Sequence, residues 1–462
     1  MESLDLWIER QYRHATAAML PSLSPVGIVK RRPGFGQTVT PKKGSIVASP
    51  VLAAYDPDPD YFFHWFRDSA VVIDALRLLL ADGSVDPAIA LEYFRDFVQF
   101  SLSLGELDGR ALVASPGWRA GVAEDFVKFV RSDAELAAIH GELVSAEARV
   151  NPDGTLDISS WARPQHDGPP LRLLAVLRWA RDVSSDAELR EDAAALIRAD
   201  IAFTRGRWRI PSFDIWEEEK GSHYYTLRVA AAALEEGAGW LEAHGDSNGD
   251  AREAQLCRAD AQTILQMLDG YWLADDGYYR SRVLDSGARS AKELDMAVIF
   301  AAIHAPGQSE HQSEDARSTA HSVYDPRMQT TLARLEALFD AQYPINRDRP
   351  VVRGPAMGRY EGDVYYSGGA YYFSTLAAAE FYFRAAVGRR VEHSDRRALI
   401  DRGDAFLETV RAFTPSSGDM SEQFDQKTGV QTSARHLAWS YAAFISCIVA
   451  RRDASRYRIL HR

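Results

Sequence analysis

The 462-residue sequence has few positive charges relative to negative ones, no long apolar run and only two cysteines. Its 53 basic residues are outnumbered by 65 acidic residues and form no stripe. A net charge of −12 therefore argues against nucleic acid or an anionic membrane as a partner, because phosphates require clustered Lys and Arg. No stretch of about 20 apolar residues is present, so no membrane-spanning segment is expected.

The two cysteines, Cys257 and Cys447, lie far apart and lack the spacing of metal ligands. We expect two buried free thiols, and a disulfide stays open as the alternative. The first 20 residues carry acidic side chains and have the pattern of an amphipathic helix, not of a signal peptide. The protein is therefore expected in the cytoplasm, unless a leader has been removed. We also expect a monomer.

Apolar residues recur with the 3.6-residue period of helices, and convincing strand pairs are hardly found. Some helices are amphipathic, whereas others, such as LAWSYAAFISCIVA (437–450), are apolar nearly all round and must be buried on every side. Two helix populations in roughly alternating order favour an all-α barrel with an inner and an outer ring over a bundle or a solenoid. The predicted helices are 3–20, 67–82, 86–103, 170–182, 185–205, 224–242, 250–269, 292–304, 325–341, 369–388, 396–412 and 434–451.

Two helix starts are clear from the sequence. Asp86 and Pro87 supply an N-cap and a first-turn proline, and Ser185 with Glu188 fits a capping box. Short connections alternate with long ones, and if the short turns share one end of the barrel, the long loops gather at the other and form a pocket there. No linker divides the chain, so 1–462 is expected to form one domain. The long connections are 21–66, 105–166, 206–223, 270–291, 305–324, 342–368 and 413–433.

Five clusters in these loops mix aromatic, acidic and Arg residues. A pyranose has apolar faces that stack on Trp and Tyr and a rim of hydroxyls that suits Asp, Glu and Arg. Cleaving a glycosidic bond requires two carboxyl groups, one protonated and one ionised. The clusters therefore favour a carbohydrate hydrolase. They are DYFFHWFRDSA (60–70), SSWARPQHDGPPLR (159–172), FDIWEEEKGSHYYT (213–226), GRYEGDVYYSGGAYYF (358–373) and DMSEQFDQKTGVQTSARHLAWSY (419–441).

The same residues also allow purely structural interpretations. Residues 217–219 could form a solvated acidic turn with Trp216 in the core, and Asp68 could cap the helix that begins near residue 67. Glu422 by itself is uninformative. Residue types alone therefore do not choose one glutamate of the triplet.

In this order, the five clusters resemble those of glycoside hydrolase family 15, the glucoamylases, over residues 3–450. The resemblance implies an (α/α)6 barrel of six helical hairpins with long loops at the active-site end. It further implies inverting, exo-acting hydrolysis that releases β-glucose from the non-reducing ends of short α-gluco-oligosaccharides. No metal or organic cofactor and no starch-binding module are expected.

Matching the motifs residue by residue implies individual roles. Glu217 would be the general acid and Glu422 the general base, about 6.5–9.5 Å apart, which leaves room for the water that Glu422 deprotonates. The residues implied to bind sugar are Tyr61, Trp65, Arg67, Asp68, Trp161, Trp216, Glu218, Arg359 and Tyr371.

Four positions depart from the family pattern. Glu361 and Gly362 replace a proline and an acidic residue, Tyr371 replaces a tryptophan, and His166 replaces an arginine. We expect these positions to contact the second sugar, which leaves the linkage open. Hydrolysis of α-1,4 bonds is the first hypothesis, and α-1,6 substrates such as isomaltose, or trehalose, are the alternatives. An inactive sugar-binding protein is the alternative from another class.

Overall fold

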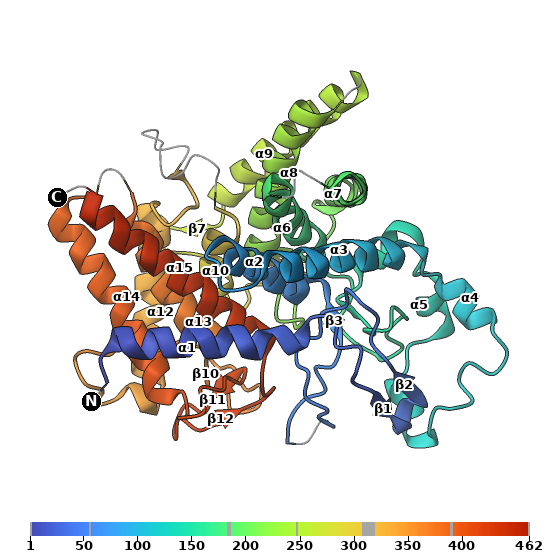
Figure 1. Cartoon of the computed structure of the whole chain (residues 1–462), viewed down its shortest axis with the longest axis horizontal. Helices are drawn as coiled ribbons and strands as arrows, with labels where there is room; N and C mark the ends of the chain where they lie inside the picture. The colour runs from blue at the N-terminus through green and yellow to red at the C-terminus, as the bar shows by residue number, and fades with distance from the viewer. Residues whose placement is uncertain are drawn as a thin grey trace.

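The computed structural model describes residues 2–54, 57–182, 186–245, 248–306, 319–388 and 391–460. Long helices dominate it, and each predicted helix has one counterpart (Figure 1). These are α1 (Leu4–Met19), α2 (Phe66–Ala81), α3 (Pro87–Ser103), α6 (Gly168–Asp182), α7 (Ala187–Arg207), α8 (Tyr224–His244), α9 (Asn248–Asp269), α10 (Ala297–His304), α12 (Pro326–Gln342), α13 (Tyr372–Ala386), α14 (His393–Phe413) and α15 (Ala438–Leu460).

Six of these helices form a closed inner ring. Neighbours in the ring run from α2 through α6, α8, α10, α13 and α15 back to α2. The other helices pack outside it: α1 on α15, α3 on α2 and α7, α7 on α6, α9 on α8, α12 on α10 and α14 on α13. Inner and outer helices alternate along the chain, which confirms the predicted (α/α)6 barrel.

Burial separates the two rings as the apolar pattern predicted. Residues 297–303 of α10 are all buried, whereas the outer helix α9 buries only a stripe that includes Cys257 and Ile264. Cys257 and Cys447 are both buried and unpaired, which confirms the expected free thiols. In the part of the chain that the structure describes, no helix is long and apolar enough to cross a membrane.

Small antiparallel sheets join the loops that precede neighbouring inner helices. One joins the loops before α2 and α6, a second those before α8 and α10, and a third those before α13 and α15, so these loops share one end of the barrel. The sequence did not predict these strands, because two to four residues are too few for a recognisable alternation. They are β3 (His64–Trp65) with β4 (Arg149–Val150), β5 (Ser212–Phe213) with β6 (Lys220–His223) and β9 (Arg282–Leu284), and β10 (Ala370–Tyr371) with β11 (Gln423–Phe424) and β12 (Gln431–Thr432).

The segment before α6 carries additional structure that was expected to be loop. Its short helices α4 (Gly109–Ala114) and α5 (Asp133–Ala137) lie to one side of the barrel, together with the hairpin of β1 (Lys30–Arg32) and β2 (Gln37–Val39) (Figure 1). A further hairpin pairs β7 (Trp272–Leu273) with β8 (Tyr278–Tyr279). Short 3-10 helices are Leu20–Ser22, Pro33–Phe35, Leu104–Glu106, Glu124–Phe129, Gly141–Ala146 and Pro344–Asn346.

Three local predictions have different outcomes. Asp86 caps α3 by accepting the backbone N–H groups of residues 88 and 89, as predicted. Ser185 lies outside the described residues, and the observed N-cap of α7 is Asp186. The connection 305–324 was expected among the pocket loops. It instead leaves α10 at its C-terminal end, the opposite end of the barrel, and its residues 307–318 lie outside the described part.

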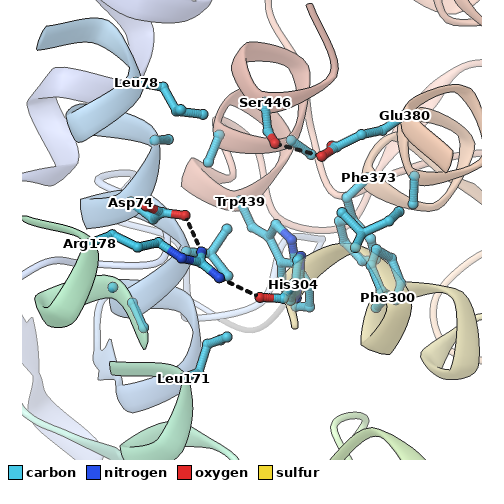
Figure 2. Close-up of a pocket in the computed structure, with 18 of the residues that line it drawn as sticks. Asp74, Leu78, Leu171, Arg178, Phe300, His304, Phe373, Glu380, Trp439 and Ser446 are labelled. Atoms are coloured by element: carbon cyan, nitrogen blue, oxygen red, sulfur yellow. Dashed lines mark hydrogen bonds and ion pairs between the residues drawn. The ribbon is translucent and has the colours of Figure 1, made fainter. Parts of the chain in front are cut away.

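A cavity of about 50 Å³ lies inside the inner ring (Figure 2). The cavity exists because small alanine side chains of the inner helices line it, among them Ala75, Ala175 and Ala377. Phe373 and Trp439 form its boundary towards the loop end, because both also line a second cavity there. We call it the lumen cavity, and its polar lining residues are Asp74, Arg178, His304, Glu380, Arg384 and Ser446.

Candidate active site

The second cavity, also about 50 Å³, opens among the loops that precede the inner helices. This loop-end cavity brings together eight predicted site residues: Tyr61, Trp65, Arg67, Asp68, Trp216, Glu217, Arg359 and Glu422. Ile215, Phe373, Leu437 and Trp439 complete its lining and were not predicted. Phe373 and Trp439 stand at the beginnings of apolar inner helices, where an aromatic residue is indistinguishable from core in the sequence.

Glu217 presents its carboxylate to this cavity from the loop before α8. The indole N–H of Trp65 donates to Oε1 at 2.8 Å, and the indole N–H of Trp161 donates to Oε2. Arg67 lies 3.4 Å from Oε1. Three donors from two other loops therefore fix the orientation of the carboxylate.

Asp214 holds the turn that carries Glu217. Its carboxylate accepts the backbone N–H groups of residues 216, 218 and 219, and its carbonyl accepts that of Glu217 at 2.9 Å. Glu217 has φ +64°, a left-handed conformation that costs a non-glycine residue about 1–2 kcal/mol. The hydrogen bonds of Asp214 offset this cost, as is usual for an Asp that opens a turn.

The other two glutamates of the triplet are engaged elsewhere. Glu218 binds Arg359 at 3.0 Å and Lys292 at 2.6 Å. Although burial raises the pKa of Glu218, the two cations lower it below its ordinary value. The third glutamate forms an ion pair with Arg282 at 2.9 Å. Of the three, only Glu217 lines the loop-end cavity.

Glu422 faces the same cavity from the loop before α15. Ser433 donates to its Oε2, and the hydroxyl of Tyr61 donates to its Oε1 at 3.3 Å. Burial raises the pKa of Glu422 to about 7, although the Ser433 hydrogen bond and the charge of Arg359 both lower it. This carboxyl therefore changes protonation near neutral pH, as groups in acid–base catalysis do.

Arg67 and Asp68 lie beside the two carboxyls at the start of α2. Arg67 forms ion pairs with Asp68 at 3.2 Å and Asp167 at 3.4 Å. Even so, Nε of Arg67, Oδ2 of Asp68 and Oδ1 of Asp167 are buried without an aligned hydrogen-bond partner among the described residues. Since buried polar groups in folded proteins are normally paired, three such atoms together indicate hydrogen-bonding capacity for a ligand.

The structural alternative for Asp68 does not hold. Helix α2 begins at Phe66 with Trp65 in the N-cap position, so Asp68 lies inside the first turn. Burial raises the pKa of Asp68 to about 6, Arg67 lowers it, and the nearby charge of Glu217 raises it again. Its carboxyl is therefore a functional candidate and not a helix cap.

Three predicted sugar-binding residues lie around the cavity without lining it. Trp161 is partly exposed and reaches Glu217, and Glu218 is held by cations as described above. Tyr371 is buried behind the wall, where its hydroxyl donates to Asp363 at 3.2 Å and accepts from Gln423 at 2.8 Å. Its ring lies 6.4 Å from that of Trp216, between centroids. In this structure Tyr371 therefore supports the cavity from behind.

The remaining positions that depart from the family pattern fall into two groups. His166 was expected near the second sugar but lies buried, with Nδ1 3.2 Å from the carbonyl of Ile210 and its ring against Phe203. Glu361 and Gly362 are exposed and directly follow Tyr360, whose hydroxyl donates to Glu218. Only the second group directly follows a residue that contacts the glutamate triplet.

Comparison with known proteins agrees with this geometry. A glucoamylase of Neurospora crassa is 26% identical over 449 residues, which cover 88% of this chain but only 63% of that protein. A probable glucoamylase of Schizosaccharomyces pombe is 26% identical over 487 residues, covering 97% of this chain and 92% of that one. The solved glucoamylase of Hormoconis resinae superposes with a TM-score of 0.76 at 24% identity, over 97% of this chain and 74% of that chain.

The sequence model of the family described as glycosyl hydrolases family 15 matches residues 146–449, well over half of the chain. This match spans the loops that carry Glu217, Arg359 and Glu422, and the barrel agrees with that of the solved relatives. The chain therefore belongs to glycosyl hydrolase family 15.

Proposed function

We propose that the protein hydrolyses α-glucosidic bonds with inversion and releases β-glucose from the non-reducing ends of short α-gluco-oligosaccharides. The observation that carries the proposal is the presence in one cavity of Glu217, oriented by three donors, and of Glu422, a buried carboxyl on a separate loop. The relatives named as glucoamylases support glucose as the sugar.

In this proposal Glu217 is the general acid. Its carboxyl proton passes to the glycosidic oxygen as the bond from that oxygen to C1 breaks. Glu422 is the general base and takes a proton from the water that attacks C1 from the opposite face, which requires the two carboxyls about 6.5–9.5 Å apart. Since burial raises the pKa of Glu422 to about 7, the base is ionised only towards the alkaline side of that value.

The terminal glucose would bind at the base of the loop-end cavity. The unpartnered atoms of Arg67, Asp68 and Asp167 would bind its hydroxyls, since they are a donor and two acceptors in a buried site. Tyr61 and Trp65 would cover an apolar face of the ring, because their own rings lie 5.1 Å apart along the cavity wall. Phe373 and Trp439 separate the base of this cavity from the lumen cavity, and a site without a passage behind it would favour exo-acting cleavage.

The second sugar would determine the linkage. Glu218, held between Arg359 and Lys292, offers fixed acceptors at the mouth, and the partly exposed Trp161 offers a stacking surface. We favour α-1,4 bonds, and isomaltose or trehalose are the alternatives to be measured.

The proposal is tested by initial rates of glucose release from maltose, maltotriose, isomaltose and trehalose. We expect Glu217→Gln and Glu422→Gln each to lower kcat by at least about 10²-fold. Glu188→Gln, an exposed position on α7, is the matched control and should change nothing. Unchanged glucose release in both site variants would refute the assigned roles. Binding of these sugars without any hydrolysis by the wild type would favour an inactive sugar-binding protein.

A further inference from the structure

The loop that carries Glu217 is enclosed by a second segment far along the chain. Residues 282–295, here called the clamp segment, run from β9 to the start of α10, and β9 pairs with β6 directly after the glutamate triplet. The clamp segment contacts residues on both sides of Glu217. Its contacts are Arg282 with Asp214 and Glu219, Ser290 with Glu219, Lys292 with Glu218, and Asp295 with Trp216.

Arg282 is the centre of these contacts and is only 1% exposed. Its Nη1 donates to Asp214 at 2.6 Å and to Glu219 at 2.9 Å, and its Nη2 donates to Asp295. One guanidinium thus binds three carboxylates from two loops, the β5–β6 loop and the segment before α10. Only the planar fork of an arginine has donors in this arrangement, and a lysine ammonium does not reproduce it.

Two of these carboxylates bind the residues around Glu217. Asp214 accepts the N–H groups that stabilise the left-handed turn, and Asp295 accepts the indole N–H of Trp216 at 2.9 Å and 3.0 Å. Trp216 directly precedes Glu217 and lines the loop-end cavity. Arg282 itself does not line that cavity, so any effect on the reaction passes through Asp214 and Asp295.

We propose that Arg282 is the positioning residue of the general acid: by binding Asp214 and Asp295 together, it keeps the strained turn in the conformation that directs the Glu217 carboxyl at the glycosidic oxygen. This inference rests on the proposed role of Glu217. Lys292 and Ser290 belong to the same clamp segment and hold Glu218 and Glu219, respectively, away from the acid position.

The leaving group provides a specific test of acid positioning. A glucose leaving group departs from maltose only if the glycosidic oxygen receives the proton of Glu217. From α-glucosyl fluoride, fluoride departs as the anion without a proton, while water still attacks C1 and Glu422 still accepts its proton. A variant that misplaces only the acid therefore loses hydrolysis of maltose and retains hydrolysis of the fluoride.

The experiment compares kcat for the two substrates in Arg282→Met and Arg282→Lys. We expect kcat on maltose to fall about 10²-fold in Arg282→Met, as a displacement of about 1 Å at a reacting group causes, and kcat on the fluoride to fall less than about fivefold. Arg282→Lys keeps the buried charge and should fall between wild type and Arg282→Met on maltose. Arg289→Met is the control, because Arg289 lies in the same segment but is exposed and pairs with Asp276 and Glu293.

Glu217→Gln on the same two substrates separates this inference from the proposed function. If Glu217→Gln lowers both rates equally, Glu217 is not the acid and the proposed function fails. If Glu217→Gln affects only maltose but folded Arg282→Met or Arg282→Lys lowers both rates equally, or neither, the positioning role of Arg282 is refuted. If Arg282→Met does not fold, Arg282→Lys decides by the same ratio.

Discussion

The barrel contains two neighbouring cavities of similar size. Charged side chains pair with one another in the lumen cavity, whereas some of those in the loop-end cavity have unpaired atoms. The lumen cavity and the loop-end cavity share Phe373 and Trp439 as a partition. In the lumen cavity, Arg178 binds Asp74 at 2.6 Å, and Glu380 binds Arg384 and accepts from Ser446 at 2.8 Å (Figure 2). The charges that line the lumen cavity therefore satisfy one another.

The loop-end cavity leaves its polar groups incompletely paired. Among its lining residues, Nε of Arg67 and Oδ2 of Asp68 have no aligned partner among the described residues, and burial raises the pKa of Glu422 to about 7. In the lumen, burial also raises the pKa of Asp74, but Arg178 and Arg77 outweigh it and lower the value to about 2. Volume alone does not distinguish the two cavities. Unpaired atoms of charged side chains and raised carboxyl pKa values do, and they mark the loop end as the candidate site of chemistry.

Helix direction contributes to this difference. Inner helices begin at the loop end, so their partial positive charges face the carboxylates there, and Arg384 lies in the last turn of α13 on the lumen side. The polarity of the ring thus favours anions at one end and cations at the other.

The largest effect is expected from Asp68→Asn at the loop end. The substitution removes a charged acceptor from the group of unpartnered atoms, so kcat/KM on maltose should fall about 10²-fold while the melting temperature changes little. Steady-state kinetics and thermal unfolding measure the two quantities. An unchanged kcat/KM would mean that the unpaired atoms do not mark the sugar site.

The matched substitution in the lumen, Asp74→Asn, should have the reverse effect. Displacement of the Asp74 pKa from 3.8 to about 2 corresponds to about 2 kcal/mol of stability, so the free energy of unfolding should fall by about that amount. Activity at 25 °C should stay within about twofold of wild type, because the residue lies apart from the loop-end cavity.

The pH dependence of this effect has a definite sign. Because the folded-state pKa is depressed, the stabilisation is fully present above about pH 4 and is lost as pH falls towards 2. Denaturant unfolding of wild type and Asp74→Asn should therefore converge at low pH. A constant difference between pH 5 and pH 2 would contradict the ion-pair explanation.

A smaller effect is expected from Ser433→Ala, which removes a hydrogen bond that opposes the effect of burial on the pKa of Glu422. The Ser433 hydroxyl stabilises the carboxylate form, so its removal should raise the pKa of Glu422 further. The acidic limb of kcat/KM against pH, which we place near pH 7 in the wild type, should move up by about one pH unit. A limb that stays in place, or moves to lower pH, would assign that limb to another group.

The smallest effect is expected from Tyr371→Phe. Its hydroxyl bonds Asp363 and Gln423 behind the cavity wall, so removing one neutral hydrogen-bonding group should lower kcat/KM about threefold, equally for maltose and for 4-nitrophenyl α-glucoside. A loss confined to maltose would instead place Tyr371 in contact with the second sugar, as its position in the motif suggests.

The helices of this fold could be predicted from the sequence because inner and outer helices differ in apolar periodicity. The all-round apolar run of α15 and the single stripe of α9 are consequences of burial, and burial is what the pattern records. The strands β3, β9 and β10 were not readable, since their existence depends on which loops meet across the barrel end.

Eight of the eleven predicted site residues line the loop-end cavity, Trp161, Glu218 and Tyr371 do not, and the contacts that arrange them could not be predicted from the sequence. The choice of Glu217 over its neighbours depends on Lys292, Arg359 and Arg282, whose contacts with the triplet come from distant loops. The residues next to Arg282 in the sequence do not indicate that its guanidinium binds three carboxylates. Likewise the sequence pattern predicts Trp439 as a core residue, because it begins an apolar inner helix and packs in the core as well as lining the cavity.

The central claim, inversion by Glu217 and Glu422, is tested most directly by proton NMR of the anomeric region during the first minutes of maltose hydrolysis. Enzyme is added at a concentration that completes cleavage before mutarotation. The account predicts an early excess of β-glucose, because the glucose from the non-reducing end is released only as the β-anomer, while the reducing-end glucose enters with the anomeric ratio that it had in maltose. An initial excess of α-glucose would contradict it, because that product requires a covalent or otherwise retaining pathway.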